Sequence, residues 1–383
     1  MNSKLQQFLN IFRGPPAVID RAVEKPTFDV LFLCSSLMDE TWIRSTAQAC
    51  RDAGLSVCLC VCSEGENEPE IRAIYDDAEI PCFLNIAFAE AAKIPCLIAV
   101  TASSGLERTI FPTTAKAFVH MPHSLASLHM IYPEDAFFGY DVLFAAGPQH
   151  VAEFEAICAA NKLADRQCFS VGYGKLDILK DKLYALTSVE HRGAKKHVLL
   201  APSWGNDNVL ERCGVDLCTA LLAAGFRVTV RPHPLFFIEN VPVVDEIKTI
   251  ADKNLYLVLE SPLIKDKALL TADIMIGDYS GISYEFAALR RRPVVSVDVG
   301  LKVVNETWEA LDLLPVEIRC RSAIGTVVKP DVRLILASVA ALLDDERDVF
   351  VDEEAISEFL FSAPGSCGQR ASELLHQMIR GMK

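Results

Sequence analysis

The chain has 383 residues, of which 51% are hydrophobic and 23% charged, so it is long enough for two domains and too apolar for a disordered protein. Its formal net charge of −14 argues against a general nucleic-acid-binding protein, because phosphate backbones require a basic surface. It contains no run of about 18 apolar residues, the length that a membrane-spanning helix needs.

The first half of the chain alternates expected strands and helices. An amphipathic helix is expected from Met1 to Arg13, packed on its own domain, with contact to a membrane surface as the alternative. Apolar runs typical of buried parallel strands follow at 28–34, 55–62, 94–100, 117–119 and 140–145. Helices are expected at 39–53 and from about residue 149.

A second series begins after the charged stretch 180–196. Strands are expected at 197–201, 227–231, 255–259, 273–276 and 293–297, with a helix at 209–224. Repeated strand–helix units predict an α/β protein made of two Rossmann-like domains that face each other across a cleft. We expect domains at 1–180 and 181–365, and a last helix within 366–383 that packs back on the first domain.

The thirteen cysteines lie mainly in apolar runs, as in the alternating Cys58, Cys60 and Cys62. Such cysteines are typical of small buried side chains in a reducing cytoplasm. No cysteine pair has convincing zinc spacing, so we expect no metal site.

The strongest local motif follows the expected strand 273–276. Asp278, Ser280 and Ser283 can cap the start of the next helix, and Gly281 allows close approach of a ligand. Free backbone N–H groups at such a helix start can bind phosphate. The alternative is an ordinary capped helix.

A second motif is the segment 231–234, at the end of an expected strand. Its flanking prolines hold His233 in extended backbone, where the ring can donate a hydrogen bond to phosphate or move a proton. Arg231 can add positive charge. A structural role for this histidine is the alternative.

Three histidines follow the expected strand 117–119 in the first domain. They are His120, His123 and His129. If the protein transfers a group from a donor to the hydroxyl of an acceptor, the base that removes the hydroxyl proton should lie in this domain, across the cleft from the donor. One or two of the three can instead be packing or acceptor-binding groups.

Two further loops lie near the expected domain junction. Ser203 follows the strand 197–201 and can contact phosphate, while Lys175 follows two glycines that suit a hinge and can reach an anion. Neither loop has the glycine-rich pattern and Lys-Ser/Thr pair of a P-loop nucleotidase.

Taken in order, these motifs resemble the CDP-glycerol glycerophosphotransferase family, which builds teichoic-acid-like cell-surface polymers and has the GT-B fold. The resemblance covers about residues 115–380 and rests on the segments 171–177, 201–204, 231–234, 278–286 and 365–370. The chain departs from the family pattern at Gly281, which replaces a serine, at Lys175, which replaces an arginine, and at His123, which is followed by serine instead of glycine.

The resemblance implies roles for the motif residues. His123 would be the general base, and His233 would stabilise the leaving nucleotide. The donor and its phosphates would be held by the remaining motif residues, which are Ser203, Arg231, Asp278, Ser280, Gly281, Ser283 and Glu285. His120, His129 and Lys175 would be secondary or acceptor-side residues. No metal or cofactor would be required, because histidine and the helix dipole would supply positive charge.

The expected activity is therefore transfer of a glycerol-phosphate or related polyol-phosphate unit from a CDP-linked donor to a hydroxyl of a glycan or lipid-linked acceptor. One alternative is a GT-B glycosyltransferase that uses a UDP- or CMP-sugar. Another is a non-catalytic nucleotide-sugar-binding assembly partner. We expect a cytoplasmic protein, with the inner face of the membrane as a place where it meets its acceptor, and no nucleic-acid partner.

Overall fold

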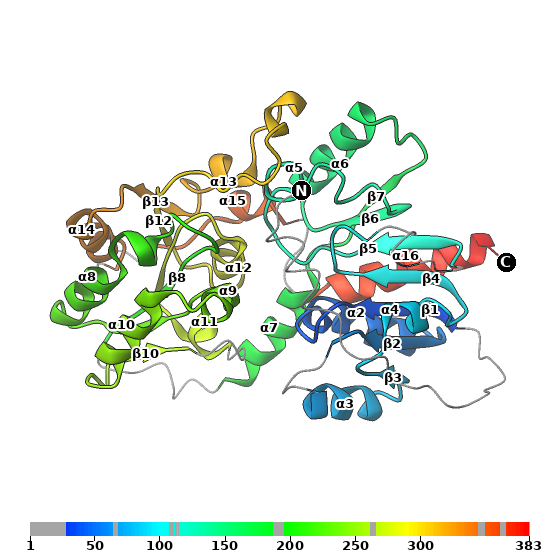
Figure 1. The fold of residues 1–383 in the computed structure, drawn as a ribbon, viewed down its shortest axis with the longest axis horizontal. Coiled ribbons are helices and arrows are strands. Elements are labelled where there is room, and N and C mark those ends of the chain that lie inside the picture. Colours follow the sequence, from blue (N-terminus) through cyan, green and yellow to red (C-terminus); the bar gives the residue numbers. More distant parts are fainter. Residues whose placement is uncertain are drawn as a thin grey trace.

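The computed structural model describes residues 28–63, 68–106, 111, 113, 115–186, 195–260, 266–343, 349–360 and 365–382. The helix expected from Met1 to Arg13 lies outside these residues. Within them, two parallel sheets form two lobes, which lie side by side in Figure 1 with α7 (Gly174–Ala185) between them.

The first sheet has the order β3-β2-β1-β4-β5-β6-β7. Its strands are β1 (Phe28–Cys34), β2 (Val57–Val61), β3 (Cys82–Phe83), β4 (Cys96–Thr101), β5 (Ala117–His120), β6 (Val142–Ala145) and β7 (Gln167–Ser170). All neighbouring strands pair in parallel. β2 is buried at every position, which explains why cysteine alternates with valine and leucine there.

The second sheet has the order β10-β9-β8-β11-β12-β13 and is also parallel. Its strands are β8 (His197–Ala201), β9 (Arg227–Val230), β10 (Leu257–Leu259), β11 (Ile274–Gly277), β12 (Val294–Val297) and β13 (Gly325–Val328). The α/β architecture predicted from the alternating pattern is therefore confirmed, and β3, β7 and β13 are additions that the sequence pattern did not predict.

Helices cover both faces of each sheet. In the first lobe they are α2 (Glu40–Asp52), α3 (Glu68–Asp77), α4 (Phe88–Ala91), α5 (Leu128–Ile131) and α6 (Pro148–Ala160). In the second lobe they are α8 (Val209–Ala223), α9 (Pro234–Ile238), α10 (Pro242–Ala251), α11 (Lys267–Thr271), α12 (Gly281–Arg290), η2 (Trp308–Leu311), α13 (Val316–Arg319), α14 (Val332–Leu342) and α15 (Glu353–Ser357).

The last helix, α16 (Cys367–Met382), returns to the first lobe. Its buried residues, including Ala371 and Leu375, share a hydrophobic core with Ile43 and Ala47 of α2 and with β1. Asp177 of α7 accepts hydrogen bonds from the backbone N–H groups of Gly365 and Gly368, at 2.8 Å each, and so fixes the start of α16. Figure 1 shows α16 beside β4 and α2.

A separate core joins the two lobes. It contains Leu125 and Tyr173 from the first lobe together with Phe286 of α12 and Phe359 after α15. Burial of this shared core fixes how the two lobes face each other, because apolar area removed from water stabilises a contact. Among the described residues, no helix has the length and apolar character required to cross a membrane.

Candidate functional site

The chain reverses its direction of strand addition between β8 and β11, which are neighbours in the second sheet. Open α/β sheets bind ligands in the crevice beyond such a switch point. Ser203, just beyond β8, donates its backbone N–H to Asp278 Oδ1 at 2.6 Å, and Val209 N donates to Asp278 Oδ2 at 2.9 Å. Asp278 therefore holds the loop 203–209 across the switch point, so the expectation that it caps α12 is wrong.

The start of α12 lies at the same edge of the sheet. Ser280 is its N-cap but makes no side-chain capping hydrogen bond, contrary to expectation, and the hydroxyl of buried Ser283 has no hydrogen-bond partner among the described residues. The first-lobe loop packs directly on this turn. A Cβ added to Gly281 would lie 2.6 Å from Ser124 Oγ, so glycine here permits close contact between the lobes.

The segment after β9 places a second group at this edge. His233 is the N-cap of α9, and its Nδ1 accepts the backbone N–H of Leu235 at 3.3 Å. Burial lowers the pKa of His233 to about 4, so the ring is neutral near pH 7 and carries its proton on Nε2. Arg231 beside it lies 3.8 Å from Glu260, and its buried Nη1 has no hydrogen-bond partner in the described part of the chain. This edge thus offers hydrogen-bond donors, from the neutral His233 and from Arg231.

His123 lies in the first-lobe loop that faces α12. Its Nε2 is 2.9 Å from the Tyr132 hydroxyl, and its ring packs edge-on against Trp42 with centroids 5.8 Å apart. Burial lowers the pKa of His123, and nearby Asp39 opposes that shift. The neutral imidazole that results has a free lone pair on one nitrogen, as a general base requires.

Asp39 belongs to a polar cluster at the switch point of the first sheet, between β1 and β4. Its carboxylate accepts the hydroxyls of Ser35 at 2.6 Å, Ser36 at 2.9 Å and Ser103 at 2.9 Å. The carboxyl ends of the two sheets therefore both carry a buried aspartate that organises the neighbouring loops.

Tyr173 connects the two lobes at the site. Its hydroxyl accepts the indole N–H of Trp42 at 2.7 Å and donates to Glu285 of α12 at 2.8 Å, with the backbone oxygen of His123 also 3.0 Å away. Lys175 Nζ lies 2.6 Å from the other oxygen of Glu285. Glu285 and Lys175 neutralise each other, so neither presents a free charge to a ligand here.

The other two histidines are more deeply buried, although the ring of His120 packs edge-on against that of His123 with centroids 5.8 Å apart. His120, at the end of β5, packs against Phe137 and Tyr140, and burial lowers its pKa well below the ordinary value. His129 pairs with Glu153 at 3.3 Å and its Nε2 lies 3.1 Å from Leu313 O. Each is 1% exposed, and such burial does not favour a direct contact with an acceptor.

The structure thus brings the His123 loop, the Ser280 turn, Lys175 and Glu285 together, and joins Ser203 to Asp278 at the carboxyl edge of the second sheet. Trp42 and Tyr132 carried no sequence signal, because their role depends on contacts with residues distant in the chain. Among the described residues, no cluster of three or more His, Cys, Asp or Glu side chains could hold a metal ion.

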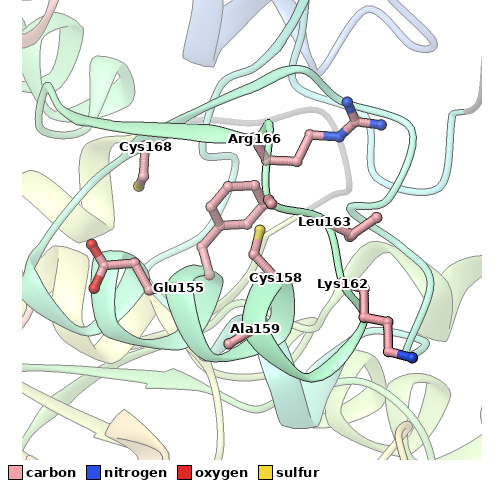
Figure 2. Close-up of a pocket in the computed structure, with 9 residues that line it drawn as sticks. Glu155, Cys158, Ala159, Lys162, Leu163, Arg166 and Cys168 are labelled. Carbon is pink, nitrogen blue, oxygen red and sulfur yellow. The ribbon is translucent and has the colours of Figure 1, made fainter.

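A hollow of about 310 Å³ lies elsewhere, between α6 and the edge strand β7. Figure 2 shows Glu155 and Cys158 of α6 on one side of it, with Lys162 and Arg166 in the following loop. None of the predicted site residues lines this hollow, so it is separate from the candidate site.

Comparison with known proteins gives one family match. Residues 140–303 match the family described as CDP-Glycerol:Poly(glycerophosphate) glycerophosphotransferase. The matched segment contains the loops of Ser203, His233 and Ser280, and it supports the family resemblance predicted from the motifs. No curated protein matches the chain.

Solved structures of nucleotide-sugar enzymes share the fold. A UDP-N-acetylglucosamine 2-epimerase is 15% identical with a TM-score of 0.59, covering 94% of this chain and 97% of its own. The Neisseria meningitidis UDP-GlcNAc 2-epimerase bound to UDP-GlcNAc (14%, TM-score 0.57) and the Methanocaldococcus jannaschii enzyme with UDP-GlcNAc and UDP (10%, TM-score 0.57) each cover 93% of this chain and 100% of their own. The chain therefore has the predicted GT-B fold of two Rossmann-like domains.

Proposed function

We propose that this chain is a transferase that moves a glycerol-phosphate or related polyol-phosphate unit from a CDP-linked donor to a hydroxyl of a glycan or lipid-linked acceptor. The observation that carries the proposal is the contact between Ser124 and Gly281, which sets the loop of the candidate base directly against the helix start that would hold donor phosphate. The family match over residues 140–303 supports the same chemistry.

In this reaction the acceptor oxygen attacks the phosphorus of the polyol phosphate. The new P–O bond forms as the bond to CMP breaks, and CMP leaves with the electron pair. His123 takes the acceptor proton, since burial keeps its imidazole neutral near pH 7. Most of the remaining rate enhancement comes from positioning and from stabilising charge on phosphate oxygens.

The second lobe supplies groups for the leaving phosphate. The neutral His233 donates a hydrogen bond from Nε2 to a phosphate oxygen, and Arg231 adds positive charge. The N–H groups of Gly281 and its neighbours, at the positive end of the α12 dipole, bind the diphosphate together with the hydroxyls of Ser280 and Ser283. Ser203 and Asp278 fix the loop that closes this crevice. Lys175 and Glu285 keep α12 in place against the first lobe.

A second candidate is transfer from a UDP- or CMP-sugar, favoured by the shared fold with enzymes whose structures hold UDP-GlcNAc. A panel of CDP-glycerol, CDP-ribitol, UDP-sugars and CMP-sugars, followed by chromatography of the products, separates the candidates. Release of CMP with a phosphorylated acceptor supports polyol-phosphate transfer. Release of UDP, or of CMP with a glycosylated acceptor, supports glycosyl transfer.

A non-catalytic binding partner would bind one of these donors and release no product even with cell-envelope acceptors. The His123→Ala variant is the matched control for catalysis. We propose that the protein acts in the cytoplasm and meets a lipid-linked acceptor at the inner face of the membrane.

A further inference from the structure

Arg321 is a buried cation that no sequence motif marks. It follows α13 and is only 5% exposed. Its Nη1 lies 3.4 Å from Asp298 Oδ1, and its guanidinium lies 4.1 Å over the ring of Tyr279. Tyr279 in turn donates its hydroxyl to the same Asp298 oxygen at 2.5 Å.

The other edge of the guanidinium is unsatisfied. Both Nε and Nη2 are buried and have no hydrogen-bond partner among the described residues. The Asp298 side chain is 51% exposed and shares its oxygen with Tyr279, so it compensates Arg321 only in part. A buried charge with open donors is costly, and an oxyanion bound at that edge would remove the cost.

The geometry of this edge suits an oxyanion. The N–H groups on Nε and Nη2 of an arginine are parallel and match two oxygens of a phosphate or carboxylate. Arginine is the preferred residue for such bidentate recognition, because its planar group keeps the two donors aligned.

The position of Arg321 indicates that the bound oxyanion is a phosphate of the donor. Tyr279, on which it stacks, directly precedes the N-cap Ser280 of α12, a helix of 10 residues. Asp298 directly follows β12, the neighbour of β11. Arg321 therefore lies at the same sheet edge as the α12 start, where the helix dipole and the guanidinium attract the same negative group.

We propose that Arg321 binds a phosphate group of the nucleotide-linked donor through Nε and Nη2 and so acts as a donor-specificity residue. This inference rests on the proposed function in that the phosphate belongs to a nucleotide-linked donor. Asp298 repels the same phosphate, and it limits how tightly a free anion is held.

Calorimetry with pyrophosphate, CMP, cytidine and CDP-glycerol tests the proposal in wild type, Arg321→Gln and Arg321→Lys. Arg321→Gln should weaken pyrophosphate and CMP binding by about 10-fold or more and leave cytidine binding unchanged, because cytidine has no phosphate. Arg321→Lys should be intermediate, since it keeps the charge and loses the fork. Arg319→Gln, two residues earlier and 37% exposed, is the matched control and should bind like wild type.

Asp298→Asn gives a result of opposite sign. It keeps the oxygen that accepts from Tyr279 and removes the negative charge, so pyrophosphate should bind a few-fold more tightly. A purely structural role for Arg321 predicts no gain in Asp298→Asn, and equal pyrophosphate binding by wild type and folded Arg321→Gln would overturn the proposal.

Comparing the binding of pyrophosphate with that of CDP-glycerol shows whether the phosphate site or the proposed donor is wrong. If Arg321→Gln loses pyrophosphate binding and wild type does not bind CDP-glycerol, the phosphate site is supported and the CDP-linked donor is refuted. Tight CDP-glycerol binding that Arg321→Gln does not weaken keeps the donor and refutes the role of Arg321. Failure of wild type to bind pyrophosphate also overturns the site.

Discussion

The hydroxyl of Tyr173 donates a hydrogen bond of 2.8 Å to the carboxylate of Glu285, and both side chains are buried. Tyr173 lies just before α7, between the two lobes, whereas Glu285 lies on α12 beside the proposed phosphate site. The bond therefore links the loop of the candidate base, through the 3.0 Å contact with His123 O, to the donor side of the cleft.

Removal of the Tyr173 hydroxyl should break the link between the His123 loop and Glu285 of α12. We expect Tyr173→Phe to lower the free energy of unfolding by about 2 kcal/mol, the scale for a hydrogen bond to a buried charged group. Turnover should fall by about 10-fold because His123 is no longer held in position. Tyr184→Phe, on α7, is the control, since Tyr184 is 77% exposed. Equal turnover and melting temperature in both variants would contradict the link.

Much of the fold could be predicted because most strands are short apolar runs. The strands 28–34 and 197–201 have the predicted bounds, and all but one of their residues are buried. β7 and β13 escaped prediction because they are edge strands with partly exposed residues, and β3 has only two residues. A local apolar pattern indicates an edge strand only where the strand is apolar throughout, as in β10 (Leu257–Leu259), which was predicted.

The site could be predicted only where chemistry and local sequence coincide. His233 stands between prolines and Ser280 stands before glycine, so each has a signal within a few residues. Tyr173 meets Glu285 across 112 positions, and Arg321 meets Asp298 from a segment with no motif. The capping role expected for Asp278 failed for the same reason, because its partners Ser203 and Val209 come from a distant loop.

His233 should contribute as a neutral hydrogen-bond donor. We expect His233→Ala to lower turnover by about 100-fold or more, as is typical for loss of one charge-stabilising group. Because burial lowers the pKa of His233 to about 4, wild-type activity should show no loss from its titration between pH 5 and pH 8. Pre-steady-state rates across that range provide the measurement. A folded His233→Ala protein with near-normal turnover would remove this residue from the mechanism.

Gly281 should be required for contact between the lobes. A Cβ at this position would lie 2.6 Å from Ser124 Oγ, which would have to move and give up the hydrogen bond that it accepts from Ala126 N, so Gly281→Ala should disturb the His123 loop and lower turnover by about 10-fold or more. The double variant Gly281→Ala/Ser124→Gly removes the clash and should recover most of the loss. Gly281→Val should also weaken donor binding, because its side chain blocks close approach of the phosphate, and calorimetry measures this. No recovery in the double variant would mean that the steric contact is not the cause.

Glu317 should make stability depend on pH. It is buried at the interface of the lobes, where it accepts the N–H of Ser127, and burial raises its pKa from 4.5 to about 7, with Glu153 adding to the shift. Between these two pH values the folded state keeps a proton that the unfolded state has lost, so the free energy of unfolding falls as pH rises. Burial lowers the pKa of nearby His129, but its contact with Glu153 outweighs this and raises the pKa overall; His129 is present in wild type and in the Glu317 variant alike.

Glu317→Gln removes this titration and keeps the acceptor for Ser127. The variant should therefore be more stable than wild type at pH 8, by about 3 kcal/mol or less, with little difference at pH 4.5. Chemical denaturation at both pH values is the measurement, and exposed Glu309→Gln is the control. A parallel pH profile for wild type and Glu317→Gln would show that Glu317 does not titrate in this window.

Alanine variants of the three first-lobe histidines should differ in whether they lower turnover or melting temperature. His123 faces the other lobe and is held by Tyr132 and Trp42, so His123→Ala should lower turnover by about 100-fold and leave donor affinity nearly unchanged. His120 packs against Phe137 and Tyr140, so His120→Ala should instead leave a cavity and lower the melting temperature. His129→Ala should act mainly on stability, because its partners Glu153 and Leu313 O would lose their contact.

Tyr132→Phe tests whether His123 is the base, because a histidine that acts only in packing would not change the pH profile of turnover. The phenol lies 2.9 Å from His123 Nε2, so its removal should shift the pH profile of turnover with a smaller change in melting temperature than His120→Ala. Turnover, donor affinity and melting temperature should therefore be measured on all four variants. If His120→Ala abolished turnover in a stable protein while His123→Ala remained active, the base would be His120. The Tyr132 hydroxyl would then act only in packing, and its loss would leave the pH profile unchanged.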